Sequence, residues 1–148
     1  MRTEHGVTIT ARDVVVATHY PMFDRALLFA RLAPRRELVV AAALPADRDP
    51  GGMYITREEN TRSVRTAPFR DGQRLLIVTG ETFTPGTPDV HKRYERLARW
   101  TGERFPGAQI LYPWAAQDND TTDHIPYVGR LHPGAKHAHV ATGFGGGG

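Results

Sequence analysis

Residues 111–130 read LYPWAAQDNDTTDHIPYVGR and hold the most informative pattern of the chain. The stretch begins apolar at Leu111 and Tyr112, passes a tryptophan, and enters a polar segment before it turns apolar again at residues 125–129. This order predicts a strand, a polar loop and a second strand. Loops of this kind present side chains at a sheet edge, where the scaffold holds them in place. We therefore expect functional residues between the two strands.

A second informative stretch, ATGFGGGG, forms residues 141–148. Residues 139–142 predict one more apolar strand, which runs into the glycines that begin at Gly143. Glycine carries no Cβ, so these positions let a backbone come close to a ligand. A glycine-rich turn binds an anion or cofactor when a helix N-terminus follows it. The sequence ends at Gly148, so we expect no such helix here.

The composition is that of a soluble globular domain. The chain has 148 residues, 40% hydrophobic and 24% charged, which suffices for one domain with a core. The sequence predicts neither a membrane span nor a secretion signal, since it has no long apolar run. The lack of cysteine excludes disulfides and thiolate chemistry and fits a cytoplasmic protein. The net charge of +3 comes from dispersed arginines, which favours a solvated surface over nucleic-acid binding.

The first eighty residues predict mainly strands. Residues 6–10 alternate like a half-buried strand, and the apolar run at 13–18 predicts a strand buried on both faces. Residues 23–32 predict a short helix, and residues 37–44 predict a strand. Three more runs with short polar connections predict an antiparallel meander, because parallel pairing needs a longer crossover. These runs are residues 53–56, 62–66 and 75–79.

One long helix is predicted after Gly80. Val90, Tyr94, Leu97 and Thr101 recur at helical spacing, and a proline and a glycine end the helix just beyond them. Basic residues fill the other positions, but an amphipathic helix that lies on a sheet is favoured over a nucleic-acid-binding face. Together the elements predict an α+β fold, with a mixed, largely antiparallel sheet and helices on one face.

Three motifs in order carry a family resemblance. They are Trp114–Asp118, Thr122–Gly129 and Ala141–Gly146, and the segment from Ala17 to His19 adds to them. Together they resemble the C-terminal signature of the D-amino-acid oxidase-like family of FAD-dependent oxidoreductases, which includes glycine, sarcosine and dimethylglycine oxidases. The Trp-x-x-Gln-Asp motif is most similar to the branch that often carries a Rieske iron–sulfur domain.

The resemblance implies a part of a larger enzyme. Residues 1–33 would be an edge of the FAD-binding domain, residues 34–131 the substrate domain, and residues 132–148 the return strand and the start of a truncated helix. The family's dinucleotide-binding glycine motif does not stand at the start of this chain. The complete enzyme would oxidise a C–N bond of a small amine or amino acid by hydride transfer to FAD. The chain alone is expected to bind no FAD and to be inactive.

The resemblance also implies which residues lie at the site. The catalytic residue stays unknown, because the sequence offers no convincing general base and the flavin takes the hydride. For Trp114 a place in the core is an equal alternative, and Gln117 and Asp118 could equally cap a turn. The cofactor-binding candidates are Thr18, His19, Gly143, Phe144, Gly145 and Gly146, and the substrate-side candidates are Trp114, Gln117 and Asp118.

Other readings of the sequence stay open or are disfavoured. Asp123 fits a turn-forming aspartate better than a catalytic one. His132, His137 and His139 with the nearby aspartates do not form a known metal-binding pattern, so a structural role is favoured. The chain could instead be a non-catalytic binding or interaction module. The exposed edge of the strand at residues 14–18 predicts self-association.

Overall fold

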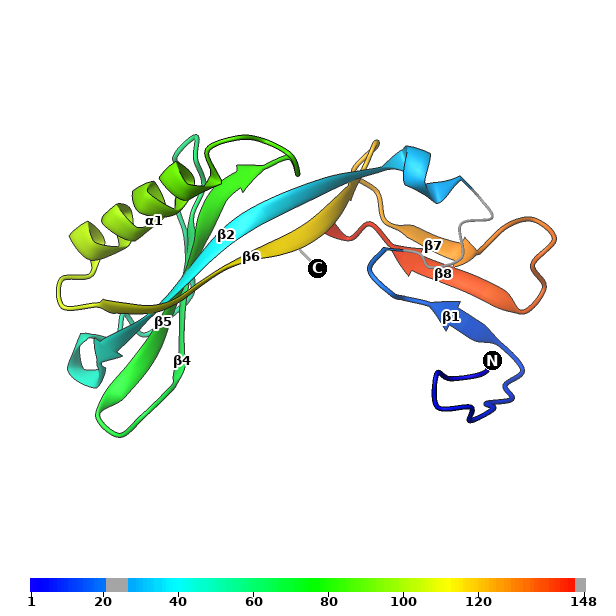
Figure 1. The fold of residues 1–148 in the computed structure, drawn as a ribbon, viewed down its shortest axis with the longest axis horizontal. Coiled ribbons are helices and arrows are strands. Elements are labelled where there is room, and N and C mark those ends of the chain that lie inside the picture. The colour runs from blue at the N-terminus through cyan, green and yellow to red at the C-terminus, as the bar shows by residue number, and fades with distance from the viewer. Residues whose placement is uncertain (21–26, 146–148) are drawn as a thin grey trace. The chain divides into compact units, whose positions relative to one another are not determined.

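The computed structural model describes residues 1–20 and 27–145, which divide into two compact units (Figure 1). The first unit comprises Met1–Pro34 and Asp118–Gly148, and the second comprises Arg35–Gln117. Each unit has a hydrophobic cluster of its own. The predicted domain boundaries at residues 33 and 131 stay predictions.

The second unit is built on a five-stranded sheet with the strand order β3-β4-β5-β2-β6. Three successive pairs, β3 with β4, β4 with β5 and β5 with β2, are antiparallel, so the predicted meander is confirmed. A short 3-10 turn, η2 (Ala46–Arg48), connects β2 to the strands that follow it. The strands are β2 (Leu32–Pro45), β3 (Tyr54–Ile55), β4 (Ser63–Pro68), β5 (Gln73–Phe83) and β6 (Gln109–Thr121).

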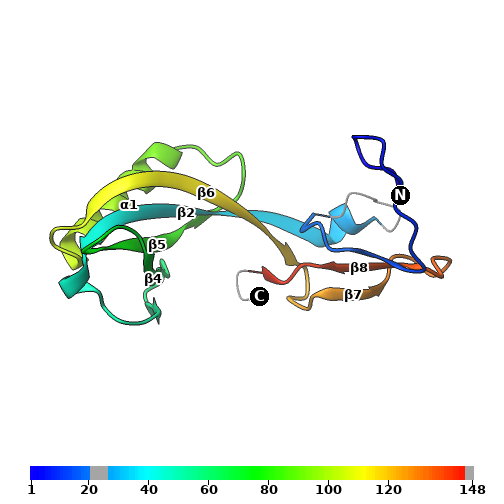
Figure 2. The same ribbon diagram turned by 90° about the horizontal axis from the view of Figure 1, so that it is seen from below.

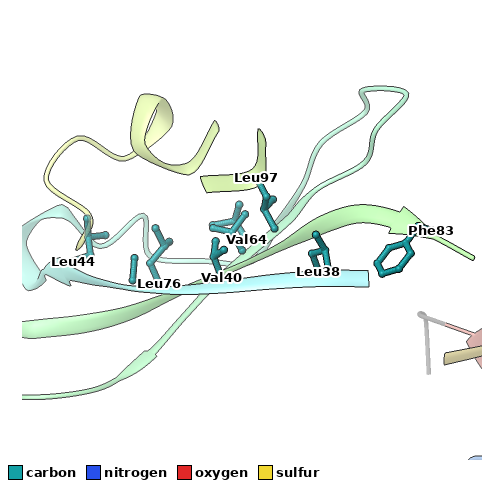
Figure 3. Packing of buried hydrophobic residues seen from close by; sticks show 9 residues of the cluster. Leu38, Val40, Leu44, Val64, Leu76, Phe83 and Leu97 are labelled. Carbon is teal, nitrogen blue, oxygen red and sulfur yellow. The ribbon is translucent and has the colours of Figure 1, made fainter. Parts of the chain in front are cut away.

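Helix α1 (Val90–Arg104) covers one face of this sheet in both views (Figures 1 and 2). Its apolar stripe buries Leu97 completely, and Figure 3 shows this side chain pointing toward Val64 and Val40 of the sheet. The helix ends at Arg104, and the backbone N–H of Phe105, which follows it, donates to the carbonyl of Thr101. The predicted helix is confirmed, and so is the α+β fold with its helix on one face.

The first unit contains a three-stranded sheet with the order β1-β8-β7. Strand β1 (Val14–Val16) pairs in parallel with β8 (Ala138–Thr142), and β7 (Tyr127–Arg130) pairs with β8 antiparallel. The 3-10 turn η1 (Leu28–Arg31) contributes to a small cluster of buried residues beside this sheet. The cluster consists of Leu28, Leu32, Leu131, Ala135 and Val140.

The N-terminal predictions are partly wrong. Residues 6–10 form no strand and make only an isolated bridge between Arg2 and Thr8. Strand β1 is not buried on both faces, since Val15 is 62% exposed and, among the described residues, β1 pairs with β8 alone. In place of a helix at residues 23–32, the described part has the turn η1, and β2 begins at Leu32. Residues 23–26 of that prediction lie outside the described residues.

The polar loop predicted after residue 112 is instead a continuation of strand β6 to Thr121. A turn of a few residues then leads to β7. Strand β6 is an edge strand, where Pro113 can be tolerated because an edge has backbone groups that need no ladder partner. The polar composition therefore reflects an exposed strand and not a loop. None of the described helices has the length and apolarity to cross a membrane.

Candidate functional site

Three segments that are distant in the sequence meet within the first unit. The Thr142 hydroxyl, at the end of β8, donates a 2.5 Å hydrogen bond to the backbone carbonyl of His19. The His19 ring nitrogen Nε2 lies 3.6 Å from Oδ1 of Asp118 on strand β6. His19 itself has a left-handed backbone with φ of 63°, which few side chains adopt. The structure thus brings together two predicted site residues, His19 and Asp118.

The glycine turn after β8 packs closely on the same segment of β6. Gly143 has a φ of +75°, and a Cβ added there would lie 2.3 Å from Cγ2 of Thr121. Gly145 has a φ of +64°, and its Cβ would lie 3.4 Å from Oδ1 of Asp120. Glycine is required at Gly143 both by its conformation and by the contact. Phe144 between them is 51% exposed, and Gly146 lies outside the described residues.

Two of the predicted polar residues hold local turns. The Thr18 hydroxyl donates to the carbonyl of Tyr20 at 2.8 Å, which fixes the turn that carries His19. Asp123 accepts a hydrogen bond from the backbone N–H of Ile125 at 3.1 Å, which is the predicted structural role of this aspartate. Thr18 therefore positions its neighbour, and its hydroxyl is occupied by the turn.

The substrate-side candidates do not all share one face. Trp114 is 42% exposed on β6, which argues against a place in the core. Gln117 accepts a 3.3 Å hydrogen bond from Nε of Arg36 on the neighbouring strand. Successive side chains of a strand point to opposite faces, so Trp114 and Gln117, three residues apart, lie on opposite faces of the sheet. A single ligand bound on one face would contact one of them.

Two buried polar side chains near the end of β6, Asn119 and Thr121, were missed from the sequence. Asn119 is 1% exposed and Thr121 is 3% exposed. Among the described residues, neither amide atom of Asn119 has a hydrogen-bond partner, and the Thr121 hydroxyl has none either. Asn119 stands between two more exposed aspartates, Asp118 and Asp120. The signal that could have identified it as buried is the alternation of side chains along a strand, which requires knowing that these residues form one.

A charged cluster in the second unit was also missed. The carboxylate of Glu81 is buried, and it accepts hydrogen bonds from Asn60 at 2.6 Å, Arg62 at 3.2 Å and Arg96 at 3.0 Å. The bond to Glu81 raises the pKa of the Arg96 guanidinium. Glu81 has a φ of 54°, and the register between β2 and β5 shifts at this point. The cluster ties α1 and the segment before β4 to the sheet, so its role is structural.

Two of the three histidines considered above, His132 and His137, make local contacts. His137 Nδ1 lies 3.1 Å from Oδ1 of Asp13, and Nδ1 of His132 accepts from the backbone N–H of Gly134 at 3.2 Å. Within residues 1–20 and 27–145, no three histidine, aspartate or glutamate side chains converge as metal ligands would.

The fold and the glycine turn define a class of protein. A family model described as "FAD dependent oxidoreductase" matches residues 1–148, and the chain belongs to this family. Among curated proteins, the chain is similar to the "Putative Rieske 2Fe-2S iron-sulfur protein YhfW" of Bacillus subtilis (strain 168), with 27% identity over 143 residues. The match covers 96% of this chain and 28% of that protein, so the chain spans about a quarter of its relative's length.

Solved structures of the same kind share the fold. The iminodiacetate oxidase of Chelativorans sp. BNC1 matches with a TM-score of 0.61 and 14% identity, over 95% of this chain and 39% of that one. The glycine oxidase of Bacillus cereus ATCC 14579 matches with a TM-score of 0.60 and 19% identity, again over 95% of this chain and 39% of the other. These matches confirm the predicted resemblance and the fold of mostly antiparallel sheets.

Proposed function

We propose that these residues form the substrate domain and one edge of the cofactor site of an enzyme that oxidises a C–N bond in a small amine or amino acid. The observation that carries the proposal is the meeting of the glycine turn with His19 and Asp118 within one compact unit. The three pieces are far apart in the sequence, yet the fold joins them at the ends of β8 and β6. Membership of the FAD-dependent family supplies the cofactor class.

The residues at the glycine turn fit a bound FAD. Gly143 and Gly145 have left-handed backbones and no side chain, so their amides can approach a ligand closely. The hydrogen bond from Thr142 fixes the backbone of His19 beside the turn. When bound, FAD would accept the hydride from the substrate carbon. The protein's own contribution would be to hold the edge of the flavin ring and to orient the substrate.

The charges at this edge support an amino group as the part of the substrate that is recognised there. Asp120 lies beside the glycine turn, and Asp118 lies beside His19. Carboxylates attract a cationic amine and repel a substrate carboxylate. In this proposal Asp118 is the substrate-side residue, and its pairing with His19 fixes its orientation.

The expected behaviour of the 148-residue chain alone is negligible FAD binding. The pyrophosphate of FAD is held by a strand–turn–helix with oriented amides, and no such motif stands at the start of this chain. Exposed arginines contribute only about 0–1 kcal/mol per ion pair, far below the roughly 8 kcal/mol of a micromolar complex. A full-length polypeptide that joins these residues to a dinucleotide-binding half should bind FAD.

Two titrations test the proposal. FAD is added to the chain alone and to the full-length polypeptide, and flavin fluorescence is followed; small amines are then added anaerobically while flavin bleaching is recorded. We expect binding and bleaching only in the full-length polypeptide. Micromolar binding by the chain alone would place the cofactor site elsewhere. A full-length polypeptide that stays colourless would favour the non-catalytic binding module instead.

A further inference from the structure

Asn119 is a buried amide without a partner in the part of the chain that the structure describes. Its side chain is 1% exposed, and neither Nδ2 nor Oδ1 makes a hydrogen bond. Buried polar groups are almost always paired, and an unpaired one destabilises the fold. A destabilising, unpaired amide is therefore a candidate for a hydrogen bond that forms only when a ligand is bound.

A second asparagine shows what a satisfied amide looks like in the same chain. Asn60 donates from Nδ2 to Glu81 at 2.6 Å, and its Oδ1 accepts from the backbone N–H of Glu81 at 3.2 Å. Both ends of that amide are therefore used. The contrast makes Asn60 a matched control for Asn119.

Asn119 lies on the side of β6 that faces the glycine turn. Asn119 and Thr121 are two residues apart on this strand, so their side chains share a face. The methyl group of Thr121 lies 2.3 Å from the position that a Cβ of Gly143 would take, so Thr121 on this face packs against the turn. The Thr121 hydroxyl is also unpaired among the described residues. Two unpaired polar side chains thus stand on one face of β6, and one of them, Thr121, packs against Gly143, where a Cβ does not fit.

We propose that Asn119 is a cofactor-binding residue whose amide pairs with the imide edge of the flavin ring. An imide offers a carbonyl oxygen next to an N–H, and a primary amide offers the complementary donor and acceptor. The side chain is only 1% exposed in this structure, so the proposal includes a rearrangement that exposes the amide to the ring. Thr121 supplies a second hydroxyl at the same face. The inference rests on the proposed function, because it takes FAD as the ligand.

The test separates stability from affinity. The variants are Asn119→Leu, which keeps the branching of the side chain without its polar atoms, and the control Asn60→Leu. For the 148-residue chain, denaturant unfolding should show that Asn119→Leu raises the folding equilibrium constant about tenfold, because an unpaired buried amide is gone. Asn60→Leu should lower it, because two hydrogen bonds and the pairing of Glu81 are lost.

In the full-length polypeptide, the substitution that stabilises the fold should weaken the affinity for FAD. Asn119→Leu should weaken FAD binding about tenfold, the loss of a ligand hydrogen bond. An FAD analogue methylated at the imide nitrogen should bind the wild type about tenfold more weakly and bind Asn119→Leu no more weakly than FAD itself. In wild-type protein, the side-chain amide signal of Asn119 in a nitrogen–proton NMR spectrum should shift on addition of FAD. This last measurement decides the matter if the leucine variant does not fold.

Each outcome has one meaning. If the wild-type polypeptide binds no FAD, the proposed function falls. If it binds FAD but Asn119→Leu binds as tightly, or the Asn119 amide signal does not move, only the inference about Asn119 is overturned. A loss of stability in Asn119→Leu equal to that in Asn60→Leu would also overturn it, since the amide would then be paired in the folded chain.

Discussion

Gly143 is the residue whose replacement should disturb the candidate site most directly. Its φ of +75° is unfavourable for any side chain, and the added Cβ would lie 2.3 Å from Cγ2 of Thr121. We expect Gly143→Ala to lower the free energy of unfolding by about 2–4 kcal/mol, from about 1–2 kcal/mol of backbone strain and the remainder from the contact. Chemical denaturation of the chain measures this loss.

A matched control isolates the contact. Gly72 has nearly the same backbone conformation, with φ of +70°, and nothing lies within 4 Å of its Cβ position. Gly72→Ala should therefore show only the backbone strain. Adding Thr121→Ser to Gly143→Ala removes the methyl group that the new Cβ would meet. The double variant should regain the stability by which Gly143→Ala falls below Gly72→Ala. Equal losses for the two glycine variants would show that Thr121 moves aside without cost.

At the scale of single residues, the sequence indicated the positions of the glycine turn but did not indicate which polar side chains are buried. Gly143 and Gly145 were singled out because glycine carries no Cβ and lets a backbone come close to a ligand, and their left-handed backbones were found only in the structure. Asn119 and Glu81 were missed because their burial depends on strands and helices from other parts of the chain. The sequence around Glu81 gives no indication that Asn60 and Arg96 contact it in the fold.

Asp49 joins elements that are distant in the sequence. Its Oδ1 accepts from the backbone N–H of Gly51 at 3.0 Å and from the Thr66 hydroxyl of β4 at 2.9 Å, and Arg74 of β5 lies 2.8 Å from Oδ2. The hydrogen bond from Gly51, followed by the one from Thr66, lowers the pKa of this carboxyl. The ionised form is thus favoured in the folded state.

The lowered pKa predicts how stability depends on pH. A carboxyl whose pKa is lower in the folded state contributes stability above its unfolded pKa of about 4, and this stability is lost as the pH falls through the folded pKa. Asp49→Asn should therefore lose stability at pH 7 and show a shallower decline below about pH 4. Urea unfolding from pH 2 to 7 checks this. Asp47→Asn is the control, because Asp47 makes no hydrogen bond or ion pair with the described residues, and a matching change there would contradict the role of Asp49.

At the scale of elements, periodicity was a reliable guide where one face is buried. Helix α1 and the meander were predicted because their apolar residues recur with the period of the element. Strand β6 was predicted too short because it is an exposed edge strand, whose polar residues look like a loop. The backbone pairing that extends β6 is set by β2, which the local sequence of β6 does not reveal.

For the whole molecule, the exposed apolar residues of the three-stranded sheet lead to a prediction about association. Strands β1 and β7 are the two edges of this sheet, and Val15 and Val128 on them are 62% and 70% exposed. Strand edges with exposed apolar side chains tend to pair with other chains. We expect the chain to self-associate at high micromolar concentration, which sedimentation velocity would detect as a mass that rises with concentration.

Charged substitutions on the two edges test whether these strands form the contact. A lysine blocks edge pairing because the next chain would have to bury its charge. Val15→Lys and Val128→Lys should each reduce the association, whereas Met53→Lys, at an 80% exposed position outside this sheet, should leave it unchanged. All three positions are exposed, so none of the variants should lose much stability. A wild-type chain that sediments as a monomer at every concentration would contradict the prediction. Association that resists both valine substitutions would place the contact on another surface.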